Sequence, residues 1–86
     1  MTTLYNHLPT LDLHGMDREY AKLLINEFIQ DQYAMKNQKV IIIHGNGTGI
    51  LKKTTQETLK KNKIVEKYKI DNFNCGQTIV LLRKKP

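Results

Sequence analysis

The 86-residue sequence has a single cysteine, no tryptophan and no long apolar run. One cysteine, Cys75, cannot form a disulfide within the chain, which excludes a disulfide-stapled secreted module. The purely apolar runs at 40–43 and 79–82 are far shorter than the ~20 residues of a membrane span. The first ten residues also lack the basic start and apolar stretch of a secretory signal. We therefore expect a cytoplasmic protein that does not enter a membrane.

Linkers, repeats and low-complexity segments are also absent from the sequence. Its two prolines, Pro9 and Pro86, lie near the two ends. A chain of this length forms one domain. The sequence predicts an N-terminal arm over residues 1–10, one domain over 11–83 and a short tail over 84–86.

Acidic residues are few relative to basic ones. Eight Asp and Glu residues face 14 Lys and Arg residues, for a formal net charge of +6. Such an excess favours a polyanionic partner such as nucleic acid, because each neutralised phosphate releases a counterion. A net charge of about 2–8 is also ordinary for a soluble small domain. Charge alone leaves both interpretations open.

Hydrophobic periodicity predicts alternating strands and helices. Residues 11–14 alternate apolar and polar side chains, and residues 39–44 form the β-branched run typical of a buried central strand. Asp17 and Thr48 stand where the N-caps of two intervening helices would lie. The four strands are expected at residues 11–14, 39–44, 64–71 and 77–83, with a turn at 72–76. The order β-α-β-α-β-β predicts an α/β domain.

Two strands are expected to end in His-Gly, at His14 and at His44. If these strands are parallel, both histidines lie at the edge of the sheet where open α/β sheets bind ligands. Asp12 and His14 are two residues apart on a strand, so they share a face. A carboxylate beside an imidazole suits a general acid or base. The alternative is that Asp12 caps the backbone and His14 is structural.

The segment Gly45-Asn46-Gly47-Thr48-Gly49 lies between a strand and a helix. Its glycines let backbone N–H groups approach a phosphate at the helix N-terminus. It matches neither the Walker loop nor G-x-G-x-x-G, and a tight turn alone would also explain it. Lys52 and Lys53 oppose the helix dipole there, so a phosphate contact explains them better than helix stability. A solvated lysine face is the alternative.

Metal ligands have no recognised spacing in this sequence. His7, His14, His44 and Cys75 do not form a zinc pattern, and few carboxylates lie near the expected site. We expect no metal site and no cofactor, with Mg²⁺ entering only if DNA is the substrate.

Three segments in this order resemble the motifs of the small MutS-related (Smr) domain. They are Leu-Asp-Leu-His-Gly at 11–15, His-Gly-Asn-Gly-Thr-Gly at 44–49 and Gly-Gln-Thr-Ile-Val-Leu at 76–81. The family's Asp-Leu-His motif maps onto residues 12–14, and its His-Gly-x-Gly loop maps onto residues 44–47. The resemblance spans about residues 11–82, as in a free-standing member. The family usually has a glycine pair where this chain has Cys75-Gly76.

The resemblance implies a two-layer α/β sandwich like the C-terminal domain of translation initiation factor three. Two helices would cover a four-stranded mixed sheet. It also implies nucleic-acid binding and, in several members, endonuclease activity on DNA or on messenger RNA at stalled ribosomes.

The leading hypothesis is therefore an endonuclease that cleaves RNA or nicks DNA. Gly45–Gly49, Lys52 and Lys53 would hold the backbone, Asp12 and His14 would supply acid–base chemistry, and His44 would stabilise charge on phosphorus. Metal-free cleavage would favour RNA, whose 2′-hydroxyl is an internal nucleophile. One alternative is a non-catalytic RNA- or DNA-binding module that acts through a partner such as the ribosome. Another is a small nucleotide-binding domain. The oligomeric state stays open.

Overall fold

The computed structural model of the chain describes residues 8–86. Most of the predicted arm over residues 1–10 therefore lies outside the described residues. The elements along the chain are β1 (Thr10–Asp12), α1 (Arg18–Ala34), β2 (Lys39–Ile43), α2 (Ile50–Lys61), β3 (Val65–Asp71) and β4 (Asn74–Leu82). The predicted order β-α-β-α-β-β is confirmed.

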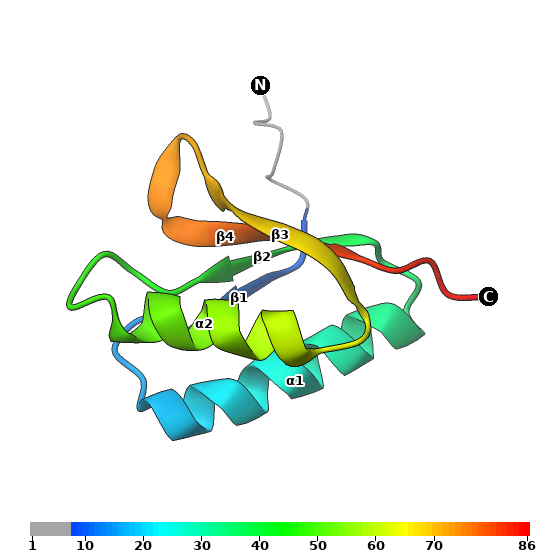
Figure 1. Ribbon diagram of the computed structural model, residues 1–86. Coiled ribbons are helices and arrows are strands. Elements are labelled where there is room, and N and C mark those ends of the chain that lie inside the picture. The colour runs from blue at the N-terminus through cyan, green and yellow to red at the C-terminus, as the bar shows by residue number, and fades with distance from the viewer. Residues whose placement is uncertain (1–7) are drawn as a thin grey trace.

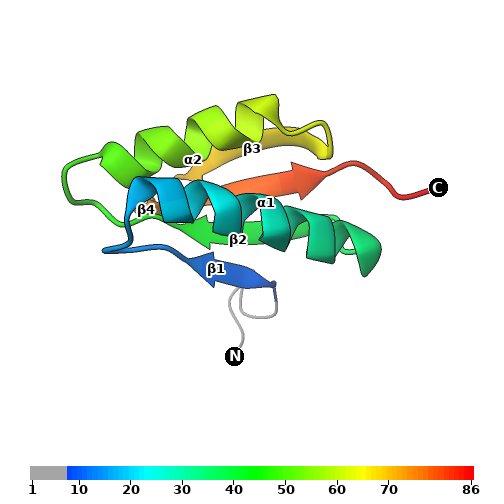
Figure 2. The ribbon, with the colours of Figure 1, turned by 90° about the horizontal axis from the view of Figure 1, so that it is seen from below.

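The four strands form one mixed sheet in the order β1-β2-β4-β3. β1 is parallel to β2, and β4 is antiparallel to both β2 and β3. Both helices cover the same face of the sheet, as two views of the ribbon show (Figures 1 and 2). The predicted two-layer α/β sandwich is confirmed. The parallel pair β1 and β2 places their carboxyl ends at one edge of the sheet.

The core lies between the sheet and the two helices. Its buried members come from every layer and include Leu13, Ile25, Val40, Leu59 and Val80. Phe28 and Leu51 pack against this cluster and are partly buried.

Neither α1 nor α2, the two helices of the described residues, has the length and apolar character needed to cross a membrane.

The two helices begin in different ways. Asp17 caps α1 as predicted, because its Oδ2 accepts hydrogen bonds from the N–H groups of Glu19 (3.0 Å) and Tyr20 (3.3 Å). The predicted cap of α2 at Thr48 is wrong, since the N-cap is Gly49 at φ 86°. Glycine adopts this left-handed conformation without the steric cost of a Cβ. Thr48 Oγ1 lies 3.4 Å from the Ile50 N–H.

β4 begins three residues before the predicted start. The turn occupies only Asn72 and Phe73, because Asp71 Oδ1 accepts a hydrogen bond from the Phe73 N–H at 2.9 Å and Asp71 already pairs with Asn74. The predicted turn at 72–76 is therefore too long. The extra strand residues, Asn74 to Gly76, bring the start of β4 against the segment that follows β2.

The buried threonine Thr55 tests whether an unpaired hydroxyl group destabilises the core. Its side chain is 0% exposed, and its Oγ1 has no hydrogen-bond partner within residues 8–86. A buried hydroxyl without a partner destabilises the folded state by about 1–3 kcal/mol. We expect Thr55→Val, which keeps the branched shape, to raise the free energy of unfolding by about 1 kcal/mol in urea denaturation. A loss of that size would contradict this reading of the core.

Candidate nucleic-acid site

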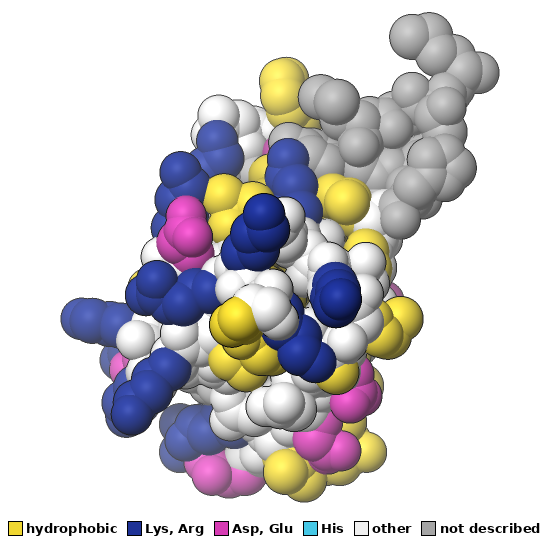
Figure 3. Space-filling view, turned by 90° about the vertical axis from the view of Figure 1, so that its right-hand side faces the viewer, with side chains coloured by type: hydrophobic (Ala, Val, Ile, Leu, Met, Phe, Trp, Pro, Cys, Tyr) yellow, Lys and Arg dark blue, Asp and Glu magenta, His cyan; other side chains and the backbone are white. Residues whose placement is uncertain are grey.

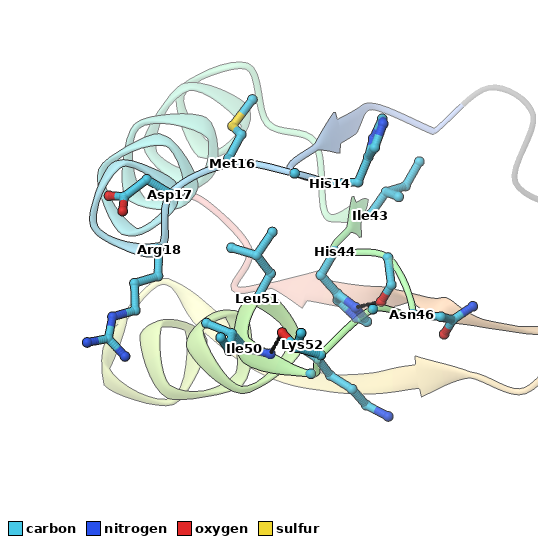
Figure 4. Close-up of a pocket in the computed structure, with 15 residues that line it drawn as sticks. His14, Met16, Asp17, Arg18, Ile43, His44, Asn46, Ile50, Leu51 and Lys52 are labelled. Atoms are coloured by element: carbon cyan, nitrogen blue, oxygen red, sulfur yellow. Dashed lines mark hydrogen bonds between the residues drawn. The ribbon is translucent and has the colours of Figure 1, made fainter.

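A pocket of about 810 Å³ opens between the loop joining β1 to α1 and the loop joining β2 to α2. It lies at the carboxyl edge of the parallel pair, where Asp12 of β1 pairs with Ile43 of β2. Its walls include His14, Arg18, His44, Lys52 and all five residues of the glycine loop at 45–49 (Figure 4). The prediction that both His-Gly turns meet at one edge of the sheet is confirmed.

Asp12 and His14 form a close pair at the rim. His14 Nδ1 lies 2.6 Å from Asp12 Oδ1, and the same oxygen accepts the His14 backbone N–H at 3.1 Å. A carboxylate only accepts, so Nδ1 carries the proton and Nε2 is left without a partner in the described structure. The His14 side chain is 73% exposed and the Asp12 side chain 49%. Asp12 therefore holds the His14 ring through Nδ1, while the Nε2 side of the ring is open to solvent.

The hydrogen bond between these two groups shifts both titrations. Bonding to Asp12, reinforced by its negative charge, raises the pKa of His14 above its ordinary value. The hydrogen bonds from His14 lower the pKa of Asp12. Asp12 thus stays ionised and stabilises a proton on the imidazole, which is what a general base or acid at this position needs.

His44 has a different environment from His14. His44 is only 3% exposed, and both nitrogens of its ring have hydrogen-bond partners inside the protein. Nδ1 donates to the Gly45 carbonyl oxygen at 3.1 Å, because a carbonyl only accepts. Nε2 must then accept from Thr78 Oγ1 at 2.9 Å. Burial lowers the pKa of His44, as does the nearby charge of Lys52, so the ring is neutral.

The two histidines are neighbours through the backbone but not through their rings. A Cβ built on Gly45 would lie 3.5 Å from the Cβ of His14, so the two turns are adjacent. The rings themselves point in different directions (Figure 4). For His44 to contact a phosphate as predicted, its ring would have to leave Gly45 and Thr78.

The glycine loop presents unpaired backbone donors. Gly47, Thr48 and Gly49 are exposed, and their N–H groups make no hydrogen bond within the described part of the chain. They lie directly before α2, at the end of that helix where the dipole is positive. Lys52 lines the pocket from the first turn of α2, whereas Lys53 is exposed beside it and lies outside the pocket wall.

Sequence reasoning missed the residues that hold the loop in place. The Gly76 carbonyl oxygen accepts the N–H groups of both His44 and Gly45 at 2.9 Å. Two residues on, Thr78 binds the His44 ring. At the loop itself, Cys75 Sγ donates to Asn46 Oδ1 at 3.0 Å. Gly76 and Thr78 lie within the third motif, but nothing in the sequence indicates that this strand contacts the glycine loop.

Arg18 is a cation of the pocket that sequence reasoning also missed. It lines the pocket from the first position of α1, and nothing in the sequence distinguishes it from any other residue at a helix start.

Within residues 8–86, no group of three or more His, Cys, Asp or Glu side chains is arranged to hold a metal ion.

Comparison with known proteins identifies related chains. The model of the Smr domain family matches residues 11–83. The chain is 33% identical over 78 residues to a protein named endonuclease MutS2 from Clostridium perfringens, and 36% identical over 69 residues to one from Clostridium botulinum. These matches cover 87% and 80% of this chain, but only 10% and 9% of the two relatives.

Solved structures show the same fold. The Smr domain of Thermus thermophilus MutS2 superimposes with a TM-score of 0.85 at 28% identity, over 88% of this chain and 99% of that one. YdaL, a stand-alone small MutS-related protein from Escherichia coli, gives a TM-score of 0.82 at 26% identity, over 87% and 64% of the two chains.

Replacing Thr78 tests whether His44 depends on its partner. Thr78→Val leaves the buried His44 Nε2 without a hydrogen bond, which costs about 1–3 kcal/mol in the free energy of unfolding. Urea denaturation measures this loss, and shifts of the amide resonances of residues 45–49 report the loosened loop.

The matched control is Thr55→Val, the same chemical change at a buried threonine whose hydroxyl has no partner in the described structure. Opposite signs for the two variants are expected. An equal effect at both positions would mean that the hydrogen bond to His44 contributes nothing.

Proposed function

Because this chain belongs to the Smr domain family, we propose that it is an endonuclease that cleaves RNA at the pocket between its two His-Gly turns. The observation that carries the proposal is the pair of Asp12 and His14. It leaves one imidazole nitrogen open to solvent beside a loop of unpaired N–H donors. The relatives named endonuclease MutS2 support a nuclease, although the chain spans about a tenth of their length.

The substrate backbone would bind across the glycine loop. The free N–H groups of Gly47, Thr48 and Gly49 suit the oxygens of a phosphate, and the N-terminus of α2 favours its charge. Lys52 on α2 and Arg18 on α1 add positive charge from opposite walls of the pocket, with Lys53 just outside. A phosphate bound in this way would lie near the rim that His14 occupies.

His14 would act as the general base. Its Nε2 takes the proton of a 2′-hydroxyl, and the freed oxygen attacks the adjacent phosphorus. A bond from the 2′-oxygen to phosphorus forms while the bond from phosphorus to the 5′-oxygen breaks. The departing 5′-oxygen takes a proton from solvent. The products are a 2′,3′-cyclic phosphate and a 5′-hydroxyl, and ionised Asp12 stabilises the imidazolium that forms.

In this proposal His44 is a positioning residue. Its neutral ring joins the Gly45 carbonyl to Thr78, so it holds the glycine loop against β4 instead of touching the substrate. RNA is favoured over DNA because its 2′-hydroxyl is a nucleophile that one imidazole can activate. DNA offers no such group and would need an activated water.

Removing the base should abolish cutting but keep binding. We expect His14→Ala to lower the cleavage rate of end-labelled RNA by about 100-fold or more, the usual share of a general base. Its affinity for the same RNA should stay within about twofold. A His14→Ala protein that cuts at the wild-type rate would refute this assignment, and a wild-type protein that binds without cutting would be a binding module.

The pH dependence separates the role of Asp12 from that of His14. A base works only when unprotonated, so the rate should rise with pH through the His14 pKa, which lies above its ordinary value of about 6.5. Asp12→Asn removes the group that raises this pKa. The rise in rate should therefore move to lower pH while the maximal rate falls.

Glu66→Gln is the matched control, since Glu66 is an exposed acid on β3. It should leave the profile unchanged. An Asp12→Asn profile with an unshifted midpoint would show that the Asp12 carboxylate does not set the titration of the catalytic group.

A further inference from the structure

Six basic side chains lie together at the end of the molecule opposite the pocket. We call this surface the basic end, and it consists of Lys60, Lys61, Lys63, Arg83, Lys84 and Lys85. These residues come from the last turn of α2, the segment after it and the chain beyond β4. All six are exposed. Figure 3 looks onto this end, and Lys and Arg side chains are spread across it.

Hydrogen bonds fix these segments beside one another. Arg83 donates from Nε to the Lys63 carbonyl oxygen at 2.8 Å, and its backbone N–H donates to the Ile64 carbonyl oxygen at 2.7 Å. The Lys85 ammonium lies 5.9 Å from the centre of the Tyr33 ring near the end of α1. The basic end is therefore a defined surface formed by the end of α2, the segment after it and the chain beyond β4, with Lys85 close to the end of α1.

The charge of this surface is not neutralised internally. Lys60, Lys61, Lys63 and Lys84 make no ion pair or hydrogen bond through their side chains within residues 8–86. The helix dipole explains Lys60 and Lys61, which lie in the last turn of α2. It does not explain Lys63 or the run of three cations at 83–85, which lie outside any helix.

The pocket, by contrast, has little net charge. Its wall carries the cations Arg18 and Lys52 and the acid Asp17, with Asp12 at the rim, and Arg18 lies 3.9 Å from Glu19. Affinity for a nucleic acid comes largely from phosphates neutralised by Lys and Arg. Most of the cations available for that purpose therefore lie outside the site where cleavage is proposed.

We propose that the basic end binds a second stretch of the polynucleotide whose backbone enters the pocket. The exposed face of α2 links the two surfaces, because Lys53 and Lys60 are seven residues apart and so lie on one side of the helix. The 12 residues of α2 span about 18 Å, so only an oligonucleotide of several residues can contact both surfaces at once. Glu57 is the acidic residue of α2, and it lies between Lys53 and Lys60 in the sequence. The inference rests on the proposed function only in taking nucleic acid as the ligand.

The experiment measures binding of 2′-O-methyl RNA, which lacks the 2′-hydroxyl and is not cut by the proposed mechanism. Affinities for a 20-nucleotide oligomer and for a dinucleotide are measured by fluorescence anisotropy over a range of salt concentrations. The variant is Lys63→Gln/Lys84→Gln. For the 20-mer, the slope of log affinity against log salt should fall by about 1.4, since each single-strand phosphate contact contributes about 0.7.

A matched control removes two cations elsewhere. Lys22→Gln/Lys69→Gln lowers the net charge equally, at α1 and β3, away from both the pocket wall and the basic end. It should keep the wild-type slope, and the dinucleotide, which is too short to span α2, should bind the basic-end variant as it binds wild type. Equal loss of slope in variant and control would overturn the proposal, as would equal weakening of both oligomers. Because no cleavage is read, failure of the nuclease proposal leaves this result unaffected.

Discussion

The carbonyl oxygen of Gly76 accepts hydrogen bonds from both His44 and Gly45, and the candidate site depends on this contact. It fixes the chain at the point where β2 ends and the glycine loop begins. Thr78 adds a second attachment by binding the buried His44 ring. Because β1 runs parallel to β2 and the Leu13 N–H donates to the Ile43 carbonyl oxygen at 2.7 Å, the position of the pair of Asp12 and His14 follows from the same anchor. The start of β4 thus fixes the position of both His-Gly turns at this edge of the sheet.

Sequence reasoning predicted the local parts of this arrangement. The predicted contact between Asp12 and His14 is present, although the strand expected over 11–14 ends at Asp12 and His14 lies in the turn that follows. The cap at Asp17 follows from the chemistry of helix starts. The state of His44 could not be predicted in this way. Its burial and its partner come from Thr78, 34 residues away, and from a hairpin turn two residues long where a longer one was expected.

The two histidines illustrate how environment separates residues that look alike in sequence. Both follow a strand and precede a glycine, yet one is charged more easily than an ordinary imidazole and the other less easily. An exposed carboxylate neighbour accounts for the first, and burial for the second. Net charge is a similar case. The sum of +6 is compatible with a polyanionic partner and with an ordinary small domain, and only the fold shows that six of the cations lie at the end away from the pocket.

In the proposed mechanism the 2′-hydroxyl of RNA is the nucleophile and His14 activates it. Analysis of the ends left by cleavage tests this most directly, because the nucleophile decides which oxygen stays on phosphorus. RNA cut by the protein should carry a 2′,3′-cyclic phosphate on one fragment and a 5′-hydroxyl on the other. A 5′-phosphate facing a 3′-hydroxyl would mean that water attacks the phosphorus, and would contradict the account.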